Sequence, residues 1–533
     1  MYHIELPRWK QSIDIPEPLT VSEVCEKAGH PLNLVCGGNG VCGKCRTWVE
    51  DGQGRRQVLA CQTPVTDGMR IDPEQEERLK ILESGYGTLS FPLTDDEKQR
   101  YAAACDLGTT SVVLYLFDRC QGRLMGQWSE SNHQSVLGGD VIARMQAALT
   151  EEGKEQLQRK GLETIGCLLA RAAGESGLTT QSISRLTIAG NSAMQHLLFG
   201  FPVRQLAASP YQCHTEEAVT RTALELGLEM APGAAVTFLP LIGSFVGGDT
   251  TAAMLAADWE RQEAVRLLID LGTNGELVIG NRERSLAASA AAGPAMEGAG
   301  IVHGMRGTAG AIERVRLEGT KLCLQVIGGG KPAGLCGSGL VDLTAVLLEC
   351  GILESNGRML SAREFLDQGG APQLAARLVT GPEDQRCFRV AGAEESAGGG
   401  DLLFYQEDVR ALQLSKGAIA AAAVLLQQAF DPAETRITQI LLAGAFGNYI
   451  DISSAQRIGL IPDYAGIEVV PIGNAAGIGA QMYLLSREKE EAAIAMAAST
   501  VHVNLASNPD FAYLFGACME LCPVSEMDLE DFL

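Results

Sequence analysis

Short runs of alternating apolar and polar residues open the chain. Residues 2–6 and 12–15 alternate in this way, which predicts two β-strands. Thr20 and Glu23 stand three positions apart before a helical pattern, as in a capping box. We therefore expect a helix that begins after Thr20 and ends near Gly29.

One more strand is predicted before the sequence becomes charged. Residues 46–50 predict a strand, and the module ends near Pro73. Residues 74–100 are rich in charge and lose the strand periodicity, so a linker is expected there. If it were flexible, this tether would span on the order of 30 Å.

A repeated pattern follows the linker. Residues 103–113 and 267–277 each show an apolar strand, then Asp-Leu-Gly-Thr, then a second apolar strand. Such internal similarity predicts a duplicated domain with two lobes. The expected boundaries are an N-terminal module at 1–73, a linker at 74–100, a large domain at 101–500 with lobes at about 101–265 and 266–485, and a C-terminal tail at 501–533.

Composition narrows the classes of function. The chain has 533 residues, 46% of them hydrophobic, and a net charge of −23, so we expect several globular domains and no nucleic-acid partner. Glycines and prolines interrupt charge-free stretches such as residues 231–248, so no membrane span is expected. Fifteen mostly scattered cysteines, with no signal-peptide pattern at the start, favour a reducing cytoplasm.

Four cysteines stand in a glycine-rich loop with a distinctive spacing. Cys36, Cys42, Cys45 and Cys61 give Cys-x5-Cys-x2-Cys-x15-Cys, the plant-type [2Fe-2S] arrangement with its first gap widened by one residue. The intervening glycines allow the backbone to wrap closely around sulfur ligands. Zinc would more often use two separate Cys-x2-Cys pairs and is the main alternative, followed by unligated thiols. Two strands, a helix and this loop predict a β-grasp ferredoxin.

Each Asp-Leu-Gly-Thr turn combines groups suited to a nucleotide. Backbone N–H groups and hydroxyls bind phosphate oxygens, and a carboxylate at a strand end can hold Mg²⁺ or orient a water. A buried hairpin with an incidental aspartate is the alternative. The predicted catalytic residues are Asp106 and Asp270, and the predicted phosphate contacts are Gly108, Thr109, Thr110, Gly272, Thr273, Asn274 and Gly275.

Other segments also favour a nucleotide site. Residues 440–449 form an apolar strand that ends in a glycine turn, which would admit a purine; a turn with a core phenylalanine is the alternative. Residues 188–194 and 471–480 are small-residue segments expected to form a hinge pair. No P-loop motif is present, which excludes a P-loop ATPase. The predicted purine contacts are Gly444, Ala445, Phe446 and Gly447.

The paired turns, Ala-Gly-Asn-Ser, Leu-Ala-Gly-Ala-Phe-Gly and Gly-Asn-Ala-Ala-Gly resemble the phosphate, connecting and adenosine motifs of the acetate and sugar kinase/Hsp70/actin (ASKHA) superfamily. With the cysteine loop and residues 138–144, 292–299 and 334–342, nearly the whole chain resembles the reductive activators of corrinoid-dependent methyltransferases. The implied fold is α/β: a β-grasp [2Fe-2S] ferredoxin followed by a duplicated ASKHA nucleotide-binding domain.

The resemblance implies ATP-dependent reduction of Co(II) corrinoid to Co(I) on a partner corrinoid protein of a methyltransferase system. Its cofactors would be a [2Fe-2S] cluster, ATP and Mg²⁺, and its donor a low-potential ferredoxin or flavodoxin. A plant-type cluster lies at roughly −400 mV, whereas the Co(I) couple lies lower, so ATP must supply free energy by changing the affinity for the partner. A homodimer is one alternative for the oligomeric state.

Two other classes of function stay open. One is an ASKHA-type small-molecule kinase with an appended ferredoxin, and the other is a non-enzymatic sensor of redox state and ATP.

Many relatives are expected to carry an extra small domain where this chain has only residues 74–100. Cys518 and Cys522 cannot complete a cluster within one chain, so a pair of buried thiols is expected there.

Overall fold

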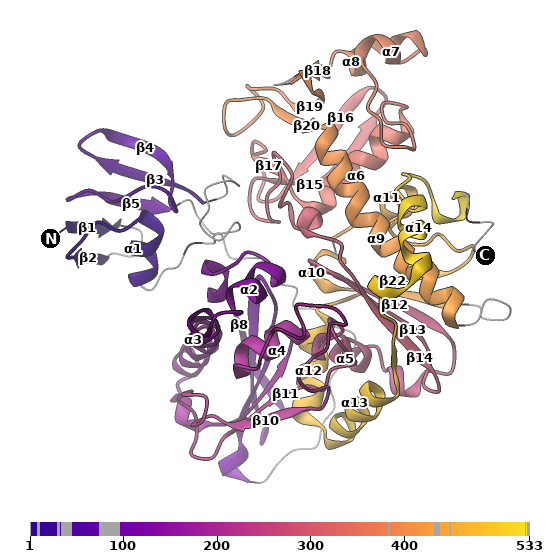
Figure 1. Ribbon diagram of the computed structural model, residues 1–533. Helices are drawn as coiled ribbons and strands as arrows, with labels where there is room; N and C mark the ends of the chain where they lie inside the picture. The colour runs from indigo at the N-terminus through magenta and orange to yellow at the C-terminus, as the bar shows by residue number, and fades with distance from the viewer. Residues whose placement is uncertain are drawn as a thin grey trace. The chain divides into compact units, whose positions relative to one another are not determined.

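The structure is a computed structural model of the whole chain. It describes residues 2–7, 11–28, 32, 45–73, 96–381, 384–430, 437–447, 449–527 and 529. These residues form two compact units (Figure 1). The described part of unit 1 falls within Met1–Glu77, Ser90–Asp249 and Ala480–Glu490, and that of unit 2 within Thr250–Gly479 and Glu491–Leu533.

Unit 1 begins with a small five-stranded sheet in the order β2-β1-β5-β3-β4. Strand β1 pairs antiparallel with β2 and parallel with β5, which gives the mixed sheet of a β-grasp module. The predicted strands and helix of this module are confirmed. Their bounds are β1 Tyr2–Leu6, β2 Gln11–Ile15, α1 Val21–Lys27, β3 Arg46–Asp51, β4 Gly54–Leu59 and β5 Arg70–Pro73.

Helix α1 begins at the predicted capping box. Thr20 Oγ1 accepts a hydrogen bond from Glu23 N at 3.3 Å, and the Glu23 carboxylate accepts one from Thr20 N at 2.7 Å. Val21 and Val24 are then buried in the same apolar cluster as Ile4 of β1. The cap fixes where the helix starts, and this apolar face holds it in the module core.

The larger part of unit 1 is a six-stranded sheet in the order β10-β11-β9-β6-β7-β8. Apolar side chains of helix α3 and of the sheet share one buried cluster. The strands are β6 Tyr101–Leu107, β7 Ser111–Asp118, β8 Arg123–Ser131, β9 Ile183–Ala189, β10 Val219–Thr222 and β11 Ala235–Phe238. The helices are α2 Val141–Ala147, α3 Glu151–Glu175 and α4 Ser192–Phe199, with a 3-10 turn, η3, at His133–Val136.

Unit 2 contains a second six-stranded sheet, in the order β22-β21-β12-β13-β14-β23. Its strands are β12 Arg266–Leu271, β13 Gly275–Gly280, β14 Ser285–Ala290, β21 Gln439–Ala443, β22 Glu468–Gly473 and β23 Val501–His502. The helices from this part of the chain onward are α5 Gly248–Ala256, α6 Gly337–Glu349, α7 Ala362–Asp367, α8 Pro372–Ala375, α9 Gln406–Phe430, α10 Gly444–Gly447, α11 Ile452–Arg457, α12 Ala475–Leu485, α13 Arg487–Ser499 and α14 Pro509–Ala517.

The two large sheets repeat one topology. In unit 1, β6, β7 and β8 form an antiparallel meander, β9 runs parallel to β6, and β11 runs parallel to β9. In unit 2, β12, β13 and β14 form the meander, β21 runs parallel to β12, and β22 runs parallel to β21. The fold therefore confirms the duplication, and each Asp-Leu-Gly-Thr segment ends the first strand of its repeat.

Helix α9 crosses the core of unit 2. Among the described residues, it alone is long and apolar enough to span a membrane, but 83% of its most apolar window is buried inside the protein. Helix α14 packs beside it, and Leu514 and Cys518 belong to the same apolar cluster as Ile419 of α9. The segment after residue 500 thus contributes a strand and a helix to the core of unit 2.

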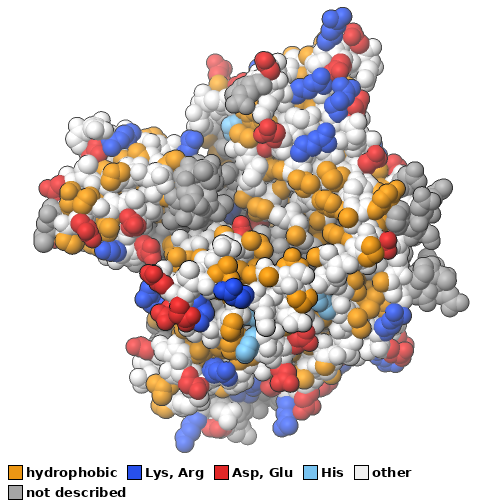
Figure 2. Space-filling model, viewed as in Figure 1, with side chains coloured by type: hydrophobic (Ala, Val, Ile, Leu, Met, Phe, Trp, Pro, Cys, Tyr) orange, Lys and Arg blue, Asp and Glu red, His pale blue; other side chains and the backbone are white. Residues whose placement is uncertain are grey.

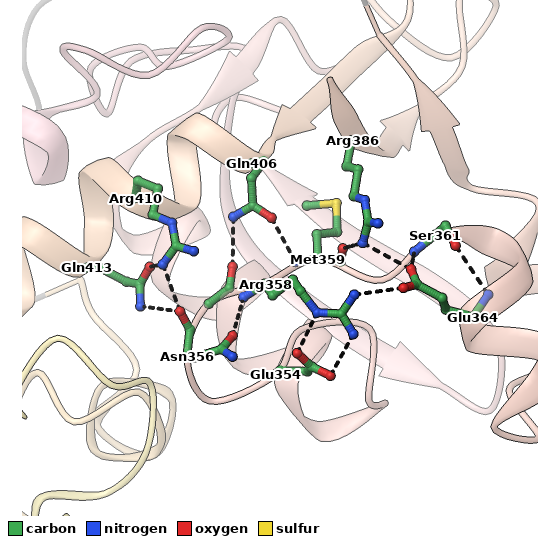
Figure 3. A network of polar contacts seen from close by, with 11 residues as sticks. Glu354, Asn356, Arg358, Met359, Ser361, Glu364, Arg386, Gln406, Arg410 and Gln413 are labelled. Atoms are coloured by element: carbon green, nitrogen blue, oxygen red, sulfur yellow. Dashed lines mark hydrogen bonds and ion pairs between the residues drawn. The ribbon is translucent and has the colours of Figure 1, made fainter. Parts of the chain in front are cut away.

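Arginine side chains connect the loops in the part of the chain between α6 and α9 (Figure 3). Arg358 donates to both Glu354 oxygens at 2.7 and 2.9 Å and to Glu364 at 2.7 Å, and Arg386 pairs with Glu364 at 3.0 Å. Capping by Ser361 and the Arg358 guanidinium hold the pKa of Glu364 down at about 2. The small sheets consist of β15 Ala311–Glu318, β16 Lys321–Val326 and β17 Gly334–Leu335, and of β18 Leu378–Thr380, β19 Arg386–Ala391 and β20 Leu402–Tyr405.

Acidic and basic side chains are interspersed over the helices and loops of unit 1 on the face drawn in Figure 2. The chain as a whole has 65 acidic and 42 basic residues, which gives its net charge of −23. A polyanion approaching this face would meet repulsion as well as attraction.

Candidate functional site

Two of the four predicted cluster ligands lie in the described part of the chain, and the structure brings them together. The sulfur atoms of Cys45 and Cys61 are 3.2 Å apart, and both side chains are buried. The other two, Cys36 and Cys42, fall outside the described residues. Two thiols at this separation can bind one tetrahedral metal, whose sulfur ligands stand about 3.8 Å apart at bond lengths of ~2.3 Å.

The backbone next to strands β3 and β4 positions Cys45 and Cys61. Cys45 immediately precedes β3. Its backbone carbonyl accepts a hydrogen bond from Ala60 N at 2.8 Å, which holds the residues after β4 close to Cys45. Gln62 Nε2 donates to the Cys61 sulfur at 3.7 Å. An N–H group aimed at sulfur stabilises the negative charge that a thiolate ligand carries. The described half of the site therefore fits an iron–sulfur cluster, both in its donor atoms and in its burial.

In unit 1, the first predicted phosphate turn lies at the carboxyl end of β6. Asp106 is half-buried and stands opposite Ala189 of the parallel strand β9. The turn that follows is tight, since a methyl group on Gly108 would lie 2.6 Å from the Ser111 carbonyl oxygen. Thr109 and Thr110 complete it. Strand ends of this kind, at the edge of a parallel pair, are where open α/β sheets bind ligands.

Asn132, which follows β8, holds this turn in place. Its backbone N–H donates to the Thr110 carbonyl at 3.0 Å, and its Nδ2 donates to the Gly108 carbonyl at 2.9 Å. Its Oδ1 accepts from Gln134 N at 3.0 Å, so the whole amide is engaged. Asn132 has no exposed surface, and a buried polar side chain with these bonds rigidifies the backbone it contacts.

A buried arginine extends this network. Arg144 donates to the Gly138 carbonyl at 2.8 Å and to Gln134 Oε1 at 3.4 Å, whereas its Nη2 has no hydrogen-bond partner among the described residues. Burial lowers the pKa of Arg144 to about 10. The motif at residues 138–144, to which the sequence assigned no role, therefore lies behind the first turn and supports it.

In unit 2, the second predicted turn lies at the carboxyl end of β12. Asp270 pairs with Ala443 of the parallel strand β21, so the next residue along that strand, Gly444, is its neighbour. Gly444 has φ +89°, and a methyl group there would lie 2.6 Å from Asp270 Oδ1. Only glycine meets both requirements. The structure thus brings Asp270 together with the start of the predicted purine segment.

The turn after Asp270 is closed by its own backbone and by a distant carboxylate. Gly272 N donates to the Asn274 carbonyl at 3.0 Å, and Gly275 opens β13 so close to Ile419 that a methyl group would lie 2.7 Å from it. The Thr273 hydroxyl donates to Glu297 Oε1. Glu297 belongs to the segment at residues 292–299, whose function the sequence did not reveal.

The predicted purine segment forms a short helical turn, α10, rather than an open glycine turn. The ring of Phe446 is half-buried, and a methyl group on Gly337 would lie 2.6 Å from Phe446 Cε2 and 1.9 Å from the Met296 carbonyl. Gly337 begins α6, so the segments at 292–299 and 334–342 meet at this ring. This close packing explains the glycine at position 337. Whether Phe446 contacts a purine stays a prediction.

The fold and these sites define a class of protein: a [2Fe-2S] module followed by a duplicated ASKHA domain. Three family descriptions match the chain. Residues 5–66 match a 2Fe-2S iron-sulfur cluster binding domain, residues 101–262 match the RACo middle region, and residues 264–531 match the C-terminal domain of RACo, the ASKHA domain.

Known proteins extend this similarity to the full length. The chain is 37% identical to the corrinoid activation enzyme RamQ of Eubacterium limosum, over 95% of this chain and 96% of that protein. It is 25% identical to a [Co(II) methylated amine-specific corrinoid protein] reductase of Methanosarcina barkeri, over 77% of this chain and 75% of that protein. A solved reductive activator for corrinoid,iron-sulfur protein superposes with a TM-score of 0.70 at 28% identity, over 99% of both chains.

The chain therefore belongs to the RACo family, the reductive activators of corrinoid proteins. It is an enzyme with a 2Fe-2S cluster binding domain and an ASKHA domain. The resemblance found in the sequence and the fold class drawn from it are confirmed.

Proposed function

We propose that this protein reduces the inactive Co(II) form of a partner corrinoid protein to Co(I), with electrons that pass through its [2Fe-2S] site and free energy from MgATP. One observation carries the proposal: a buried thiol pair and two aspartate turns at parallel strand ends occur in one chain. The activities for which the relatives are named, corrinoid activation and Co(II) corrinoid protein reduction, support this choice of substrate.

The electron-transfer part rests on four thiolates. A [2Fe-2S] cluster at this site would supply one-electron transfer. Cys36, Cys42, Cys45 and Cys61 would hold it. Within the described part, the chain keeps Cys45 and Cys61 away from water and directs the Gln62 amide at one sulfur, two factors that tune a reduction potential.

The nucleotide part rests on the two turns and on α10. Asp106 and Asp270 would position Mg²⁺ and the attacking water, because a carboxylate beside a phosphate-binding turn supplies hard oxygen ligands. Phosphate oxygens would contact backbone N–H groups of Gly108, Thr109, Thr110, Gly272, Thr273, Asn274 and Gly275, together with threonine hydroxyls of the first turn. The adenine would lie at Gly444, Ala445, Phe446 and Gly447.

Coupling between the two parts would act through the partner. Plant-type clusters have potentials of roughly −400 mV, and Co(I) formation requires a lower potential, so electron transfer alone is unfavourable. A nucleotide can shift this equilibrium only by changing the affinity of the protein for one cobalt state. We propose that MgATP binding and hydrolysis set that affinity.

The remaining features of the proposal concern the setting. A low-potential ferredoxin or flavodoxin would deliver the electrons, and the protein would act in the cytoplasm without a nucleic-acid or membrane partner. A monomer and a homodimer stay as alternatives for the oligomeric state.

Paired variants test the proposal by separating its two parts. Cys45→Ala should abolish the visible absorbance of the cluster and leave nucleotide binding intact, because the thiolate has no role at the turns. Asp106→Asn should leave the absorbance intact and slow ATP turnover by about 100-fold or more, as a lost electrostatic contact in the transition state does. Absorbance spectra and phosphate release measure the two effects.

Each variant has a matched control in unit 1. Cys25 is buried in the same module and is no predicted ligand, so Cys25→Ala should keep the cluster. Asp118 lies at the opposite end of the same hairpin, where it pairs with Arg100 at 2.9 Å, so Asp118→Asn should keep ATP turnover. Full absorbance in Cys45→Ala or unchanged turnover in Asp106→Asn would contradict the assignment.

A further inference from the structure

The two Gly-Thr turns are repeats of one motif, yet their threonines form hydrogen bonds of opposite direction. In unit 1, Thr109 Oγ1 lies 3.3 Å from Asn191 Nδ2. In unit 2, Thr273 Oγ1 contacts Glu297 Oε1. A hydroxyl has one proton to donate and two lone pairs that accept. The direction of each bond therefore decides what the hydroxyl can still offer to a ligand.

Thr109 must be the acceptor in its bond. Asn191 is the N-cap of α4, and its Oδ1 accepts from Met194 N at 2.9 Å. This bond fixes the amide orientation, so the NH₂ group faces Thr109 and can only donate. Among the described residues, no acceptor takes the Thr109 proton. That proton is available for an anionic oxygen, such as that of a phosphate.

Thr273 must be the donor in its bond, because a carboxylate oxygen only accepts. Glu297 ends the 3-10 turn η6, Pro294–Glu297, and the glycines on either side of this turn both have φ +77°. A methyl group on Gly298 would lie 2.4 Å from the Met305 carbonyl, so the backbone beside the carboxylate is closely packed. With its proton committed to Glu297, the Thr273 hydroxyl has only lone pairs left, and lone pairs bind cations.

In both repeats, the chain that follows the third strand of the meander contacts the Gly-Thr turn. Glu297 follows β14, the third strand of its meander, and lies 24 positions after Thr273. Asn132 follows β8, the third strand of the other meander, and lies 24 positions after Gly108. In unit 1 the residue after the third strand, Asn132, donates its side-chain amide to a backbone carbonyl of the turn. In unit 2 the corresponding segment provides the Glu297 carboxylate, which accepts from the threonine hydroxyl.

We propose that the repeats have divided the work: Thr109 donates to a nucleotide phosphate, whereas Thr273 is a ligand of the divalent cation and Glu297 is its positioning residue. This rests on the proposed function, in which MgATP binds. Mg²⁺ prefers hard oxygen ligands, and a threonine hydroxyl binds it in P-loop proteins. A carboxylate that accepts the hydroxyl proton makes the oxygen a better metal ligand.

Two variants of the full chain, Thr109→Val and Thr273→Val, test the proposal with binding measurements. Two assays are applied to each variant. One assay measures the affinity for ADP in the presence of EDTA. The other measures the Mn²⁺ affinity of the ADP-saturated protein by electron paramagnetic resonance. Thr109→Val should weaken metal-free ADP binding about tenfold, as expected for a lost hydrogen bond to a charged group. Thr273→Val should leave that affinity within about twofold and weaken Mn²⁺ binding about tenfold.

Conservative variants separate these roles from effects on folding. Thr109→Ser and Thr273→Ser keep the hydroxyls and should restore both affinities. Glu297→Leu keeps Thr273 but removes its acceptor, so Mn²⁺ binding should weaken while metal-free ADP binding is retained. If Thr273→Val instead weakened metal-free ADP binding and left Mn²⁺ binding unchanged, the division of work would be wrong. If the wild-type protein bound no ADP at all, the proposed function itself would be overturned, and this inference with it.

Discussion

At the scale of single residues, Lys416 is an ammonium group placed inside unit 2. It lies on α9 with no exposed surface, and its Nζ donates to the Gly459 carbonyl at 3.5 Å and to the Glu520 carbonyl. Burial lowers the pKa of Lys416 to about 8. The two carbonyls tie the segments after α11 and after α14 to α9, but they supply no full negative charge.

This pKa makes the stability of unit 2 depend on pH. The unfolded lysine keeps its proton up to about pH 10.4, whereas the folded one loses it near pH 8. Between these values the unfolded chain binds more protons, so stability rises with pH. Below pH 8 both states are protonated, and the burial penalty is fully present. The free energy of unfolding should therefore rise by about 1–3 kcal/mol from pH 7.5 to 10, relative to Lys416→Met.

Thermal unfolding of the wild-type protein and of Lys416→Met between pH 7.5 and 10 measures this difference in unfolding free energy. The variant fills similar space but cannot titrate, and it retains Cys518 and Cys522, whose thiol pKa values burial raises, so their titration largely cancels in the comparison. Cys518 is buried, as expected from the sequence, and Cys522 is only half-buried. Parallel pH profiles for the two proteins would show that Lys416 keeps an ordinary pKa.

At the scale of elements, the connection after β8 fixes the first turn through Asn132. Replacing Asn132 with alanine removes the donor to the Gly108 carbonyl, and an unsatisfied buried carbonyl costs about 1–3 kcal/mol. The turn should therefore open more often. Amide hydrogen exchange in residues 106–113 should accelerate about tenfold or more in Asn132→Ala.

A surface asparagine of another turn is the control for that experiment. Asn281 caps the connection between β13 and β14 with bonds to Glu283 N and Arg284 N at 3.0 and 3.1 Å. Asn281→Ala should leave exchange at residues 106–113 unchanged. Equal exchange in wild type and Asn132→Ala would mean that the turn is held without this side chain.

Local patterns in the sequence were enough to locate the strands that end at Asp106 and Asp270, because apolar strands followed by Gly-Thr have a clear signature. The pairing of β21 with β12 was not predicted and comes from the structure. The supports of the turns could not be predicted, since Asn132 and Glu297 reach them from 24 positions away. The signal available was a lone polar residue in a run of small ones, as at Glu297, and it identifies no partner. The roles of Asp106 and Asp270 stay predictions.

At the scale of the whole molecule, the chain combines an iron–sulfur module with a duplicated ASKHA domain, and the family matches cover residues 5–66, 101–262 and 264–531. The domain boundaries near 73, 100, 265 and 500 stay predictions. Most of the predicted linker, as well as Cys36 and Cys42, lies outside the described residues. The cysteine spacing therefore carries more of the cluster assignment than the structure does.

The central claim is that MgATP makes Co(I) formation proceed. The most direct test mixes the protein with a Co(II) corrinoid protein under anaerobic conditions, with a low-potential donor that does not itself reduce the partner. Absorbance of Co(I) is then followed with and without MgATP. We predict that the donor alone reduces the cluster, and that Co(I) accumulates steadily only when MgATP is also present. Equal rate and extent of Co(I) formation in both mixtures would contradict ATP coupling and favour a sensor of redox state and ATP.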